Sequence, residues 1–597
     1  MEKPLDNRFL HGRISRYYLL FICSKMKQLY IKFAYLLMIL SLSPLLYAQN
    51  VEESIGYLSE NLGSVTTKKS QFSQNFGIQE GKDESCMVWY QYTPSGKGDE
   101  EKFSFNAADL NENRITFDTK KDLVIISAAV KGKKDLIREY ENGEVSGYTD
   151  VVKMYANSVE DARKLVENLK ALAASCAAKI DKQLGLGEGA SKAELLAHLK
   201  ENIATVEVND ERFEQAFEAM DGETTIISYS QNELNESKLG EYKVNMIDFN
   251  AARIDFDTEK KQVVINMETK AKRNFIQQKE NGELKNYANR MKILMPTIEE
   301  ARNTVEVLKD LVRLAESEAE QMATMRSDTD PSTAMDYLGE EVEEVIINDD
   351  IYQQSFESDP DLPYMIFVEV KKEGDDEAKG FRFNISDLDP PSVDFDVKKN
   401  AVFVTAECAA NKKLIQKEEN TVVSGFTKDL EIRVKDIETA RAIQKRLSLV
   451  VKHYRENRSN NFDLQFPDAG ISEALDFCKE HIQKVGSDDK VFDQVYKIGE
   501  EGDCLAEIEV ENIDKGETKA YLFNWADINS SKVSFGTKGK EILLKVETKA
   551  RKELIQLMEN GEVDDYERDF SIRVKDIETA RALEAAMKVL AKSCSEN

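Results

Sequence analysis

Four copies of one sequence unit fill most of this chain, and that repetition constrains the fold more than any other feature. The spacings between equivalent residues are 139, 139 and 140, as in the series Asn106, Asn245, Asn384 and Asn524. Residues 432–441 and 572–581 both read IRVKDIETAR, an identity too long to arise by chance. Since the unit is several times longer than a solenoid repeat of roughly 20 to 50 residues, we expect each copy to form its own core.

The copies are numbered one to four and span residues 51–180, 190–320, 331–455 and 469–597. The intervening stretches 185–189, 321–330 and 457–470 are rich in Gly or in polar residues, which is typical of linkers. We therefore predict four domains in tandem, each able to fold alone.

The hydrophobic pattern within a copy changes its period in a fixed order. Residues 51–62 have the apolar spacing of a short amphipathic helix. About seven strand-like segments follow, which in copy one lie near residues 72–76, 86–92, 102–105, 114–117, 123–130, 136–141 and 145–156. Residues 158–174 then form an amphipathic helix that begins with an N-cap serine and acidic residues. This order predicts an α+β fold with antiparallel strands.

A two-residue turn is expected between the last two strand segments of each copy. Asn142-Gly143, Asn281-Gly282 and Asn560-Gly561 suit a turn in which both residues have positive φ. Copy three has Asn420-Thr421 instead, so we expect a looser turn or another turn type there.

The element order resembles that of the pleckstrin-homology-like superfold, including its phosphotyrosine-binding-type variants. In that superfold a bent sheet of seven strands is closed by a C-terminal helix, and the likeness covers each copy from its second segment to its end. The likeness rests on element order alone. An unrelated α+β sandwich with a helix on one face fits the same pattern, and a superfold of this kind implies no particular activity.

Residues 1–48 read as a leader that contains a secretory signal. Lys27 and Lys32 precede the apolar run 33–46, which ends at Tyr47-Ala48-Gln49. The run is short for a transmembrane helix and contains Pro44. We predict export to the periplasm or outside the cell after cleavage near Ala48, and we expect translation to start at Met26. A retained membrane anchor is the alternative. No later segment is apolar enough to span a membrane.

The exported chain is strongly acidic. Residues 1–48 hold seven Lys or Arg and two acidic residues, and their removal leaves 74 basic against 108 acidic residues, a net charge of −34. Such a charge repels nucleic acids and anionic membrane surfaces in bulk, so we expect no nucleic acid partner. A well-solvated surface is the commoner explanation of the charge itself.

Four cysteines suggest two disulfide bonds. Cys86 and Cys176 of copy one have equivalents in Cys504 and Cys594 of copy four. Copies two and three lack both members, with Thr225 and Ala315 in one and Tyr364 and Tyr454 in the other. Since the two cysteines are present or absent together, we predict the bonds Cys86–Cys176 and Cys504–Cys594, which an exported protein permits. Cys408 and Cys478 fit no such pattern and are expected to be buried thiols.

An acidic and a basic residue recur in every copy, and we consider two roles for them. The first is an ion pair that links the third strand to the closing helix of the same copy. The second pairs the arginine with a glutamate three residues earlier on its own helix, as in Glu160 and Arg163. The two interpretations are about equally favoured. The series are Asp109, Asp248, Asp387 and Asp527, and Arg163, Arg302, Arg441 and Arg581.

A basic residue before the sixth strand also recurs. In three copies a lysine stands three residues upstream of it: Lys131, Lys270 and Lys549. These positions could bind an anionic headgroup, glycan or acidic peptide, although a solvated hairpin is the more common explanation of such a cluster. Asn106 and its equivalents are expected to cap the turn before the acidic residue. The basic series is Lys134, Arg273, Lys412 and Lys552.

No catalytic, metal or cofactor motif is found in the sequence. His198, His453 and His481 fall in different copies and lack metal-ligand spacing. There is no Gly-rich phosphate loop and no calcium loop. We expect no catalytic residue, no metal and no cofactor.

The leading functional hypothesis is a non-catalytic exported protein whose four domains bind or scaffold a partner, because what recurs is structural rather than reactive. The first alternative is a carrier of a lipid or small ligand. The second is an enzyme without a recognisable signature. The partner, whether protein or small ligand, and the oligomeric state cannot be read from the sequence.

Overall fold

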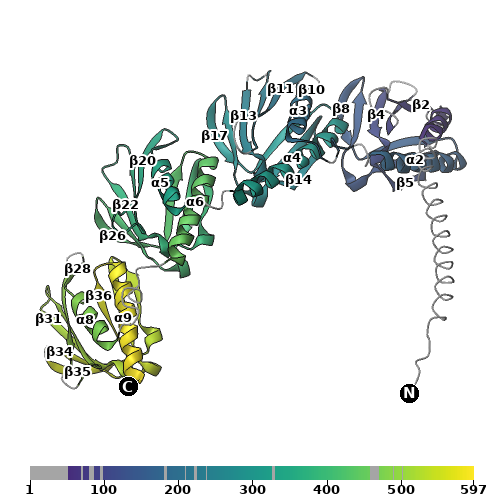
Figure 1. Ribbon diagram of the computed structural model, residues 1–597. Coiled ribbons are helices and arrows are strands. Elements are labelled where there is room, and N and C mark those ends of the chain that lie inside the picture. Colours follow the sequence, from purple (N-terminus) through teal and green to yellow (C-terminus); the bar gives the residue numbers. More distant parts are fainter. Residues whose placement is uncertain are drawn as a thin grey trace, which may run out of the picture. The chain divides into compact units, whose positions relative to one another are not determined.

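The structure is a computed structural model that describes residues 51–596, except residues 69–70, 80–85, 95–98, 181–183, 188, 209, 221–224, 235, 237, 326–329, 458–469, 488–489 and 500–501. The leader and its cleavage point near Ala48 lie outside the described residues. The fold is α+β, with antiparallel sheets and helices alternating along the chain (Figure 1).

Copy one begins with a helix over residues 51–61, as the apolar spacing predicts. Val51, Ile55, Leu58 and Leu62 on one side of this segment are buried. The strands and closing helix are β1 (Val65–Thr66), β2 (Gln71–Ile78), β3 (Met87–Pro94), β4 (Glu101–Asn106), β5 (Leu110–Lys120), β6 (Leu123–Val130), β7 (Ile137–Glu141), β8 (Glu144–Thr149), β9 (Val151–Ala156) and α2 (Val159–Ile180).

The other copies repeat this order. Copy two contains α3 (Lys192–Asn202), β10 (Val206–Val208), β11 (Glu211–Ala219), β12 (Ile226–Glu233), β13 (Lys238–Asn245), β14 (Phe249–Glu259), β15 (Gln262–Thr269), β16 (Ile276–Glu280), β17 (Glu283–Ala288), β18 (Arg290–Met295) and α4 (Ile298–Met325). Copy three contains α5 (Pro331–Glu341), β19 (Val345–Ile347), β20 (Asp350–Ser358), β21 (Met365–Lys372), β22 (Ala378–Asn384), β23 (Asp394–Lys398), β24 (Ala401–Glu407), β25 (Ile415–Glu419), β26 (Val422–Thr427), β27 (Asp429–Val434) and α6 (Ile437–Glu456). Copy four contains α8 (Ile471–His481), β28 (Val485–Ser487), β29 (Lys490–Ile498), β30 (Leu505–Asn512), β31 (Glu517–Asn524), β32 (Ser534–Lys538), β33 (Glu541–Glu547), β34 (Ile555–Glu559), β35 (Glu562–Glu567), β36 (Asp569–Val574) and α9 (Ile577–Glu596).

The strands form repeated sheet units. In copy one a six-stranded sheet has the order β1-β2-β3-β4-β7-β8, and a three-stranded sheet has the order β5-β6-β9. The corresponding strands of the later copies have the same orders, and all of these pairs are antiparallel. Strands β5 and β6 thus leave the larger sheet after β4, and β7 returns to pair with β4.

The strand count differs from the expected seven for two reasons. The first strand of each copy, such as Val65–Thr66, is too short to give a pattern in the sequence. The segment 145–156, expected as one strand, divides at Asp150 into β8 and β9, which belong to different sheets. Alternating hydrophobicity reports which face a side chain occupies, but it does not report which strand the backbone pairs with.

The turn in copy three corrects the expectation for Asn420-Thr421. Both residues have positive φ, 49° and 69°, as Asn142 and Gly143 have in copy one with 53° and 89°. Copy three therefore keeps the same kind of turn as the other copies. The flanking pairs of β25 with β26 hold Thr421 in a conformation that a β-branched residue disfavours.

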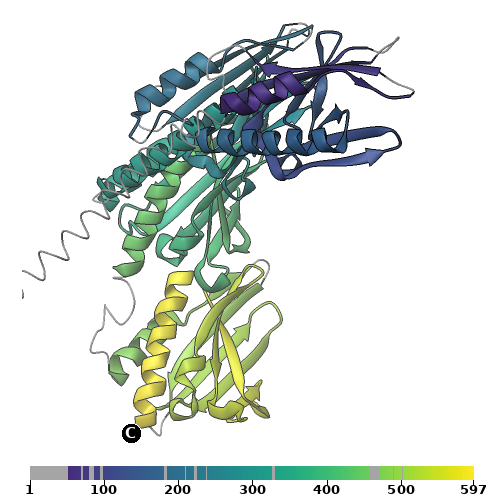
Figure 2. The same cartoon turned by 90° about the vertical axis from the view of Figure 1, so that its right-hand side faces the viewer.

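In copies one, three and four the closing helix covers the three-stranded sheet. Helix α2 contacts β5, β6 and β9, and α9 contacts the corresponding strands of copy four. In copies three and four the first helix also packs on the closing helix, α5 on α6 and α8 on α9. Figure 2 shows α9 lying along the strands of copy four.

Two disulfide bonds fix the closing helix in copies one and four. They join Cys86 to Cys176 and Cys504 to Cys594, with Cα–Cα distances of 5.6 and 5.8 Å. Each bond ties the chain at the start of the third strand to the C-terminal part of the closing helix. These are the two pairs that the joint presence of the cysteines predicts.

The contacts divide the chain into two compact units. The first unit contains copy one and most of copy two, and the second contains copies three and four together with Arg273–Phe275 and Leu284–Tyr287. In the first unit most of the buried apolar residues of copies one and two form one continuous cluster. Independent folding of a single copy stays a prediction.

Within the part of the chain that the structure describes, no helix combines the length and the apolar composition needed to cross a membrane.

Candidate functional site: the joint between adjacent copies

A short turn presents the recurrent acidic residue in every copy. The turn follows the fourth strand and has the sequence Asn-x-x-Asp, as in Asn106-Ala-Ala-Asp109. The asparagine Oδ1 accepts a hydrogen bond from the backbone N–H two residues later in all four copies. The expected cap is confirmed, and it turns the chain so that Asp109 is buried at the end of β4.

The recurrent arginine lies in the first turns of the closing helix, in the sequence Glu-x-Ala-Arg. The alanine of this motif is buried in its own copy, as Ala301 is in copy two. Since residues three apart lie on one side of a helix, Glu299 and Arg302 both project away from that core. A cap fixes the start of the helix, because the backbone N–H of Glu300 donates to Thr297 Oγ1 at 3.2 Å.

In the first unit, the arginine of copy two pairs with the aspartate of copy one. Arg302 Nη2 lies 2.7 Å from both carboxylate oxygens of Asp109, and the two side chains are only 17% and 8% exposed. Asn106 Nδ2 also donates to Glu299 Oε1 at 3.5 Å. The Asn-x-x-Asp turn of one copy and the Glu-x-Ala-Arg turn of the next therefore form a joint.

The second unit contains a matching joint. Arg581 Nη2 of copy four lies 2.8 and 2.6 Å from the two carboxylate oxygens of Asp387 in copy three. Asn384 Nδ2 donates to Glu578 Oε1 at 3.2 Å. The same four residue types thus meet in both units.

These joints correct the expected ion pair within a copy. Asp109 pairs with Arg302 and Asp387 pairs with Arg581, each in the following copy, and no ion pair joins Asp109 to Arg163 among the described residues. Arg163 and Arg441 instead lie 2.9 and 3.5 Å from Glu160 and Glu438 on their own helices, as the second interpretation expects. A repeat period cannot show whether two recurrent residues meet in one copy or across two, because both arrangements give the same spacing.

The electrostatics of the first joint are governed by burial. Burial raises the pKa of the Asp109 carboxyl, while the Arg302 guanidinium acts to lower it. Burial and the neighbouring Asp109 carboxylate raise the pKa of Glu299. The pKa of each of these two carboxyls is therefore raised despite the guanidinium beside them.

In the second joint the carboxylates act on the arginine. Burial lowers the pKa of Arg581, but the carboxylates of Asp387 and Glu578 outweigh it and raise that pKa above its ordinary value. The guanidinium thus stays charged at any pH at which the protein is folded.

The recurrent basic residues are used in contacts with acidic and aromatic side chains. Lys134 Nζ lies 2.7 Å from Asp255 Oδ2 and 5.3 Å from the centre of the Phe256 ring in copy two. Lys412 Nζ lies 5.3 Å from the centre of the Phe535 ring in copy four. Both lysines therefore belong to the joints, and neither an open anion site nor a solvated hairpin describes them.

The other two members of the basic series differ from each other. Arg273, which belongs to the second unit, lies 3.1 Å from Asp394 and covers the rings of Phe275 and Phe395. Lys552 is exposed, and its ammonium group contacts no acidic or aromatic side chain among the described residues. Upstream, Lys131, Lys270 and Lys549 donate to the backbone carbonyls of Ala108, Ile247 and Ala526, so they brace the turn that carries the aspartate.

Three further joint contacts were not predicted from the sequence. Thr258 Oγ1 of copy two donates to the carbonyl of Asp135 in copy one at 2.7 Å, and Thr537 Oγ1 of copy four donates to the carbonyl of Lys413 at 2.9 Å. Arg138 Nη2 donates to the carbonyl of Pro296 at 2.8 Å. Phe256 and Phe535 stand two residues before these threonines. This recurrence is the sequence signal from which the threonine contacts could have been found.

The remaining cysteines and histidines do not form a reactive site among the described residues. Cys408 and Cys478 are buried and unbonded, as expected, and burial raises the pKa of the Cys408 thiol to about 11. His198 lies 3.2 Å from Asn303 Nδ2, and burial lowers its pKa. No group of three or more His, Cys, Asp or Glu side chains in the described ranges is placed to hold a metal ion.

No known protein family matches the sequence, and no curated protein is similar to it.

Proposed function

We propose that this protein is a non-catalytic exported protein whose four β-rich copies act together as a binding or scaffolding array. One observation carries the proposal: within each of the two units, recurrent charged residues join one copy to the next. Asp109 with Arg302 and Asp387 with Arg581 are buried at such joints. When the recurrent polar residues of a repeated domain contact the neighbouring copies, the array gains length and avidity. It gains no reactive group.

The joints suit a scaffold because they favour one arrangement of two copies. A buried ion pair contributes little net stability, since desolvation offsets the attraction. Its loss leaves an unpaired buried charge, so any arrangement that separates Asp109 from Arg302 is disfavoured. The pair thus acts mainly on the specificity of the contact.

Export is supported by the two disulfide bonds and by the acidic composition. Disulfides form and persist in oxidising compartments. Cys86–Cys176 and Cys504–Cys594 close loops with a sequence separation of 90 residues each. The leader with cleavage near Ala48 remains part of the proposal.

The finer architecture that we propose is four tandem domains of pleckstrin-homology-like character. The order of strands followed by a closing helix supports this likeness. The pairing of β4 with β7 departs from a sheet in which consecutive strands are always neighbours. The proposal of a scaffold does not depend on the likeness.

The test compares the exported chain with a variant in which both joints are broken, Arg302→Ala with Arg581→Ala. Chemical crosslinking and mass spectrometry in the exported fraction identify the proteins held by each form. In the native chain we expect several of the four copies to be crosslinked to a partner. In the joint variant we expect far fewer of these crosslinks, while circular dichroism shows that each copy stays folded. The matched control is Arg313→Ala, which alters an exposed arginine of α4 that lies outside the joints.

Two outcomes contradict the proposal. The unmutated chain can be denatured and any released small molecule measured by mass spectrometry. Release of such a molecule in stoichiometric amount favours the carrier hypothesis. If the joint variant binds its partners as well as the native chain does, although its copies are no longer held together, the joints have no role in scaffolding.

A further inference from the structure

Copies one and four each carry one half of the joint that is paired with no other copy among the described residues. Copy one contributes Asp109 to a joint, but its own Glu-x-Ala-Arg turn contacts no other copy in the described part of the chain. Copy four contributes Arg581 to a joint, and its own Asn524-Trp-Ala-Asp527 turn pairs with no other described copy. Copies one and four therefore present two different halves of the joint.

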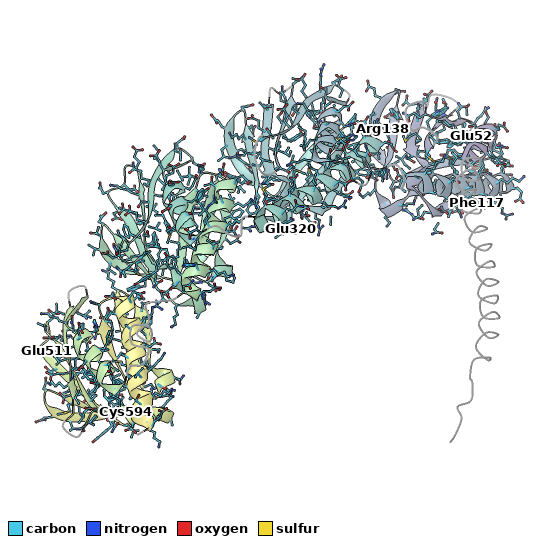
Figure 3. The ribbon with its side chains drawn as sticks, in the orientation of Figure 1. Glu52, Phe117, Arg138, Glu320, Glu511 and Cys594 are labelled. Atoms are coloured by element: carbon cyan, nitrogen blue, oxygen red, sulfur yellow. A yellow bond between two sulfur atoms is a disulfide. The ribbon has the colours of Figure 1, made fainter. Side chains whose placement is uncertain are left out.

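The half of the joint in copy one consists of residues whose equivalents in copies two and four are buried at the joints. Its members Phe117, Thr119, Glu160 and Arg163 occupy the positions of Phe256, Thr258, Glu299 and Arg302. Phe256 and Phe535 are 8% and 7% exposed, whereas Phe117 is only partly buried. Arg163 is 61% exposed against 17% for Arg302. Figure 3 shows Phe117 and Arg138 toward opposite sides of copy one, and Arg138 is one of the residues that contact copy two.

The half at copy four contains the partners of those residues. Asn524, Asp527 and Lys552 occupy the positions of Asn106, Asp109 and Lys134 in copy one. Asn524 retains its cap on the turn, so the turn is already formed. Asp109 and Asp387 are 6% and 3% exposed, but Asp527 is only partly buried, and its carboxylate makes no ion pair with any residue that the structure describes.

We propose that the protein associates head to tail, with the Asp527 end of one chain bound to the Arg163 end of a second copy of the same chain. The two halves are complementary in charge. Each contains the same residue types as the equivalent half of a joint that is formed within this chain. The contacts expected are Arg163 with Asp527, Lys552 over the Phe117 ring, and Asn524 with Glu160. Thr119 would donate to the carbonyl of Glu553, as Thr258 does to that of Asp135.

This contact joins two different surfaces, so it is heterologous. Contacts of that kind continue into an open chain of molecules or close into a ring, and they do not stop at a dimer. The association extends the proposed scaffold but is argued from the joints alone, so its failure would leave a scaffold of single chains intact.

Sedimentation velocity of the full exported chain over a range of concentrations tests the proposal. We expect the average mass of the native chain to rise with concentration beyond that of a dimer. Arg163→Asp and Asp527→Ala each block one end, and each variant alone is expected to stay monomeric. An equimolar mixture of the two retains one native half from each chain and should form dimers that grow no further.

Arg313→Asp is the matched control, because Arg313 is 59% exposed and pairs with Asp310 three residues earlier on α4, as Arg163 pairs with Glu160 on α2. This variant should associate as the native chain does. Thermal unfolding of every variant checks that the fold is retained. The proposal is overturned if the native chain is monomeric at all concentrations, if either blocked variant associates like the native chain, or if the mixture of blocked variants stays monomeric.

Discussion

Arg302 and Arg163 are the same residue of one repeated helix, yet they have different surroundings. Arg302 is buried against Asp109 of the preceding copy, whereas Arg163 is exposed and contacts only Glu160 on its own helix among the described residues. The local sequence is Glu-x-Ala-Arg in both cases. The difference therefore comes from the neighbouring copy and not from the helix, and it identifies the motif as half of an interface.

The largest expected effect is the loss of a buried pair. Arg302→Ala should lower the free energy of unfolding of the first unit by about 3 to 5 kcal/mol, because it leaves Asp109 charged and buried. Arg163→Ala should change it by less than about 0.5 kcal/mol, because its pair is exposed. Urea denaturation of the full chain, followed by hydrogen exchange to locate the loss, measures both.

A double-mutant cycle sharpens this result. Asp109→Ala combined with Arg302→Ala should cost less than the sum of the single changes, because the second change removes the charge that the first leaves unpaired. Equal costs for Arg302→Ala and Arg163→Ala would show that the buried pair has no special role.

The second comparison is between copies with and without a disulfide. Cys86→Ser with Cys176→Ser should destabilise copy one by about 2 to 4 kcal/mol, through the greater freedom of its unfolded chain. Non-reducing peptide mapping of the native protein should recover Cys86 with Cys176 and Cys504 with Cys594. Recovery of all four as free thiols from the exported fraction would contradict the bonds.

Copy two offers the reverse experiment. Thr225 and Ala315 occupy the positions of Cys86 and Cys176 and are both buried. Thr225→Cys with Ala315→Cys should form a bond in the same place, although the contact of Thr225 with Glu318 is lost. Failure to oxidise would show that the two backbone positions differ between copies.

A third prediction concerns pH at the first joint. The raised pKa of Glu299 means that the folded state binds a proton more tightly than the unfolded state. The free energy of unfolding should therefore rise as the pH falls from neutral through the folded pKa, and this gain should be complete below the ordinary value of 4.5. Glu299→Gln should stabilise the joint at neutral pH and remove this part of the pH dependence.

Unfolding free energies measured at several pH values test this point, with Glu160→Gln as the control in the exposed turn of copy one. A Glu299→Gln variant that keeps the native pH profile would assign the effect to another group.

The smallest expected difference lies in the basic series. Lys134→Glu should cost about 1 kcal/mol, because it breaks a partly exposed pair with Asp255 and places two negative charges together. Lys552→Glu should cost almost nothing, because Lys552 is exposed at the open end of copy four. Thermal denaturation of the two variants gives the comparison, and equal effects would contradict the placement of Lys134 in a joint.

Local features of the fold could be read from the sequence because local chemistry determines them. The amphipathic spacing predicted the helix at residues 51–61, and the asparagine caps and the turns with positive φ follow from residue type. The division of residues 145–156 between two sheets was missed, because strand pairing depends on partners that are distant in the sequence.

Repetition in the sequence determined more than composition could. The absence of two cysteines from the same two copies pointed to the disulfide pairs, because a bond constrains both of its members at once. The constant spacing also singled out the aspartate, arginine and lysine series as positions with a shared role. The constant spacing thus identified the residues of the joints but did not indicate which copy supplies the partner of each residue.

Only the tertiary structure decided which copy supplies each partner. Asp109 and Arg163 are 54 positions apart, and Asp109 and Arg302 are 193 apart, yet the repeat spacing favours neither pair. The choice depends on how the closing helix of copy two packs beside the turn of copy one. That packing comes from buried contacts formed across two copies, and no single repeat contains them.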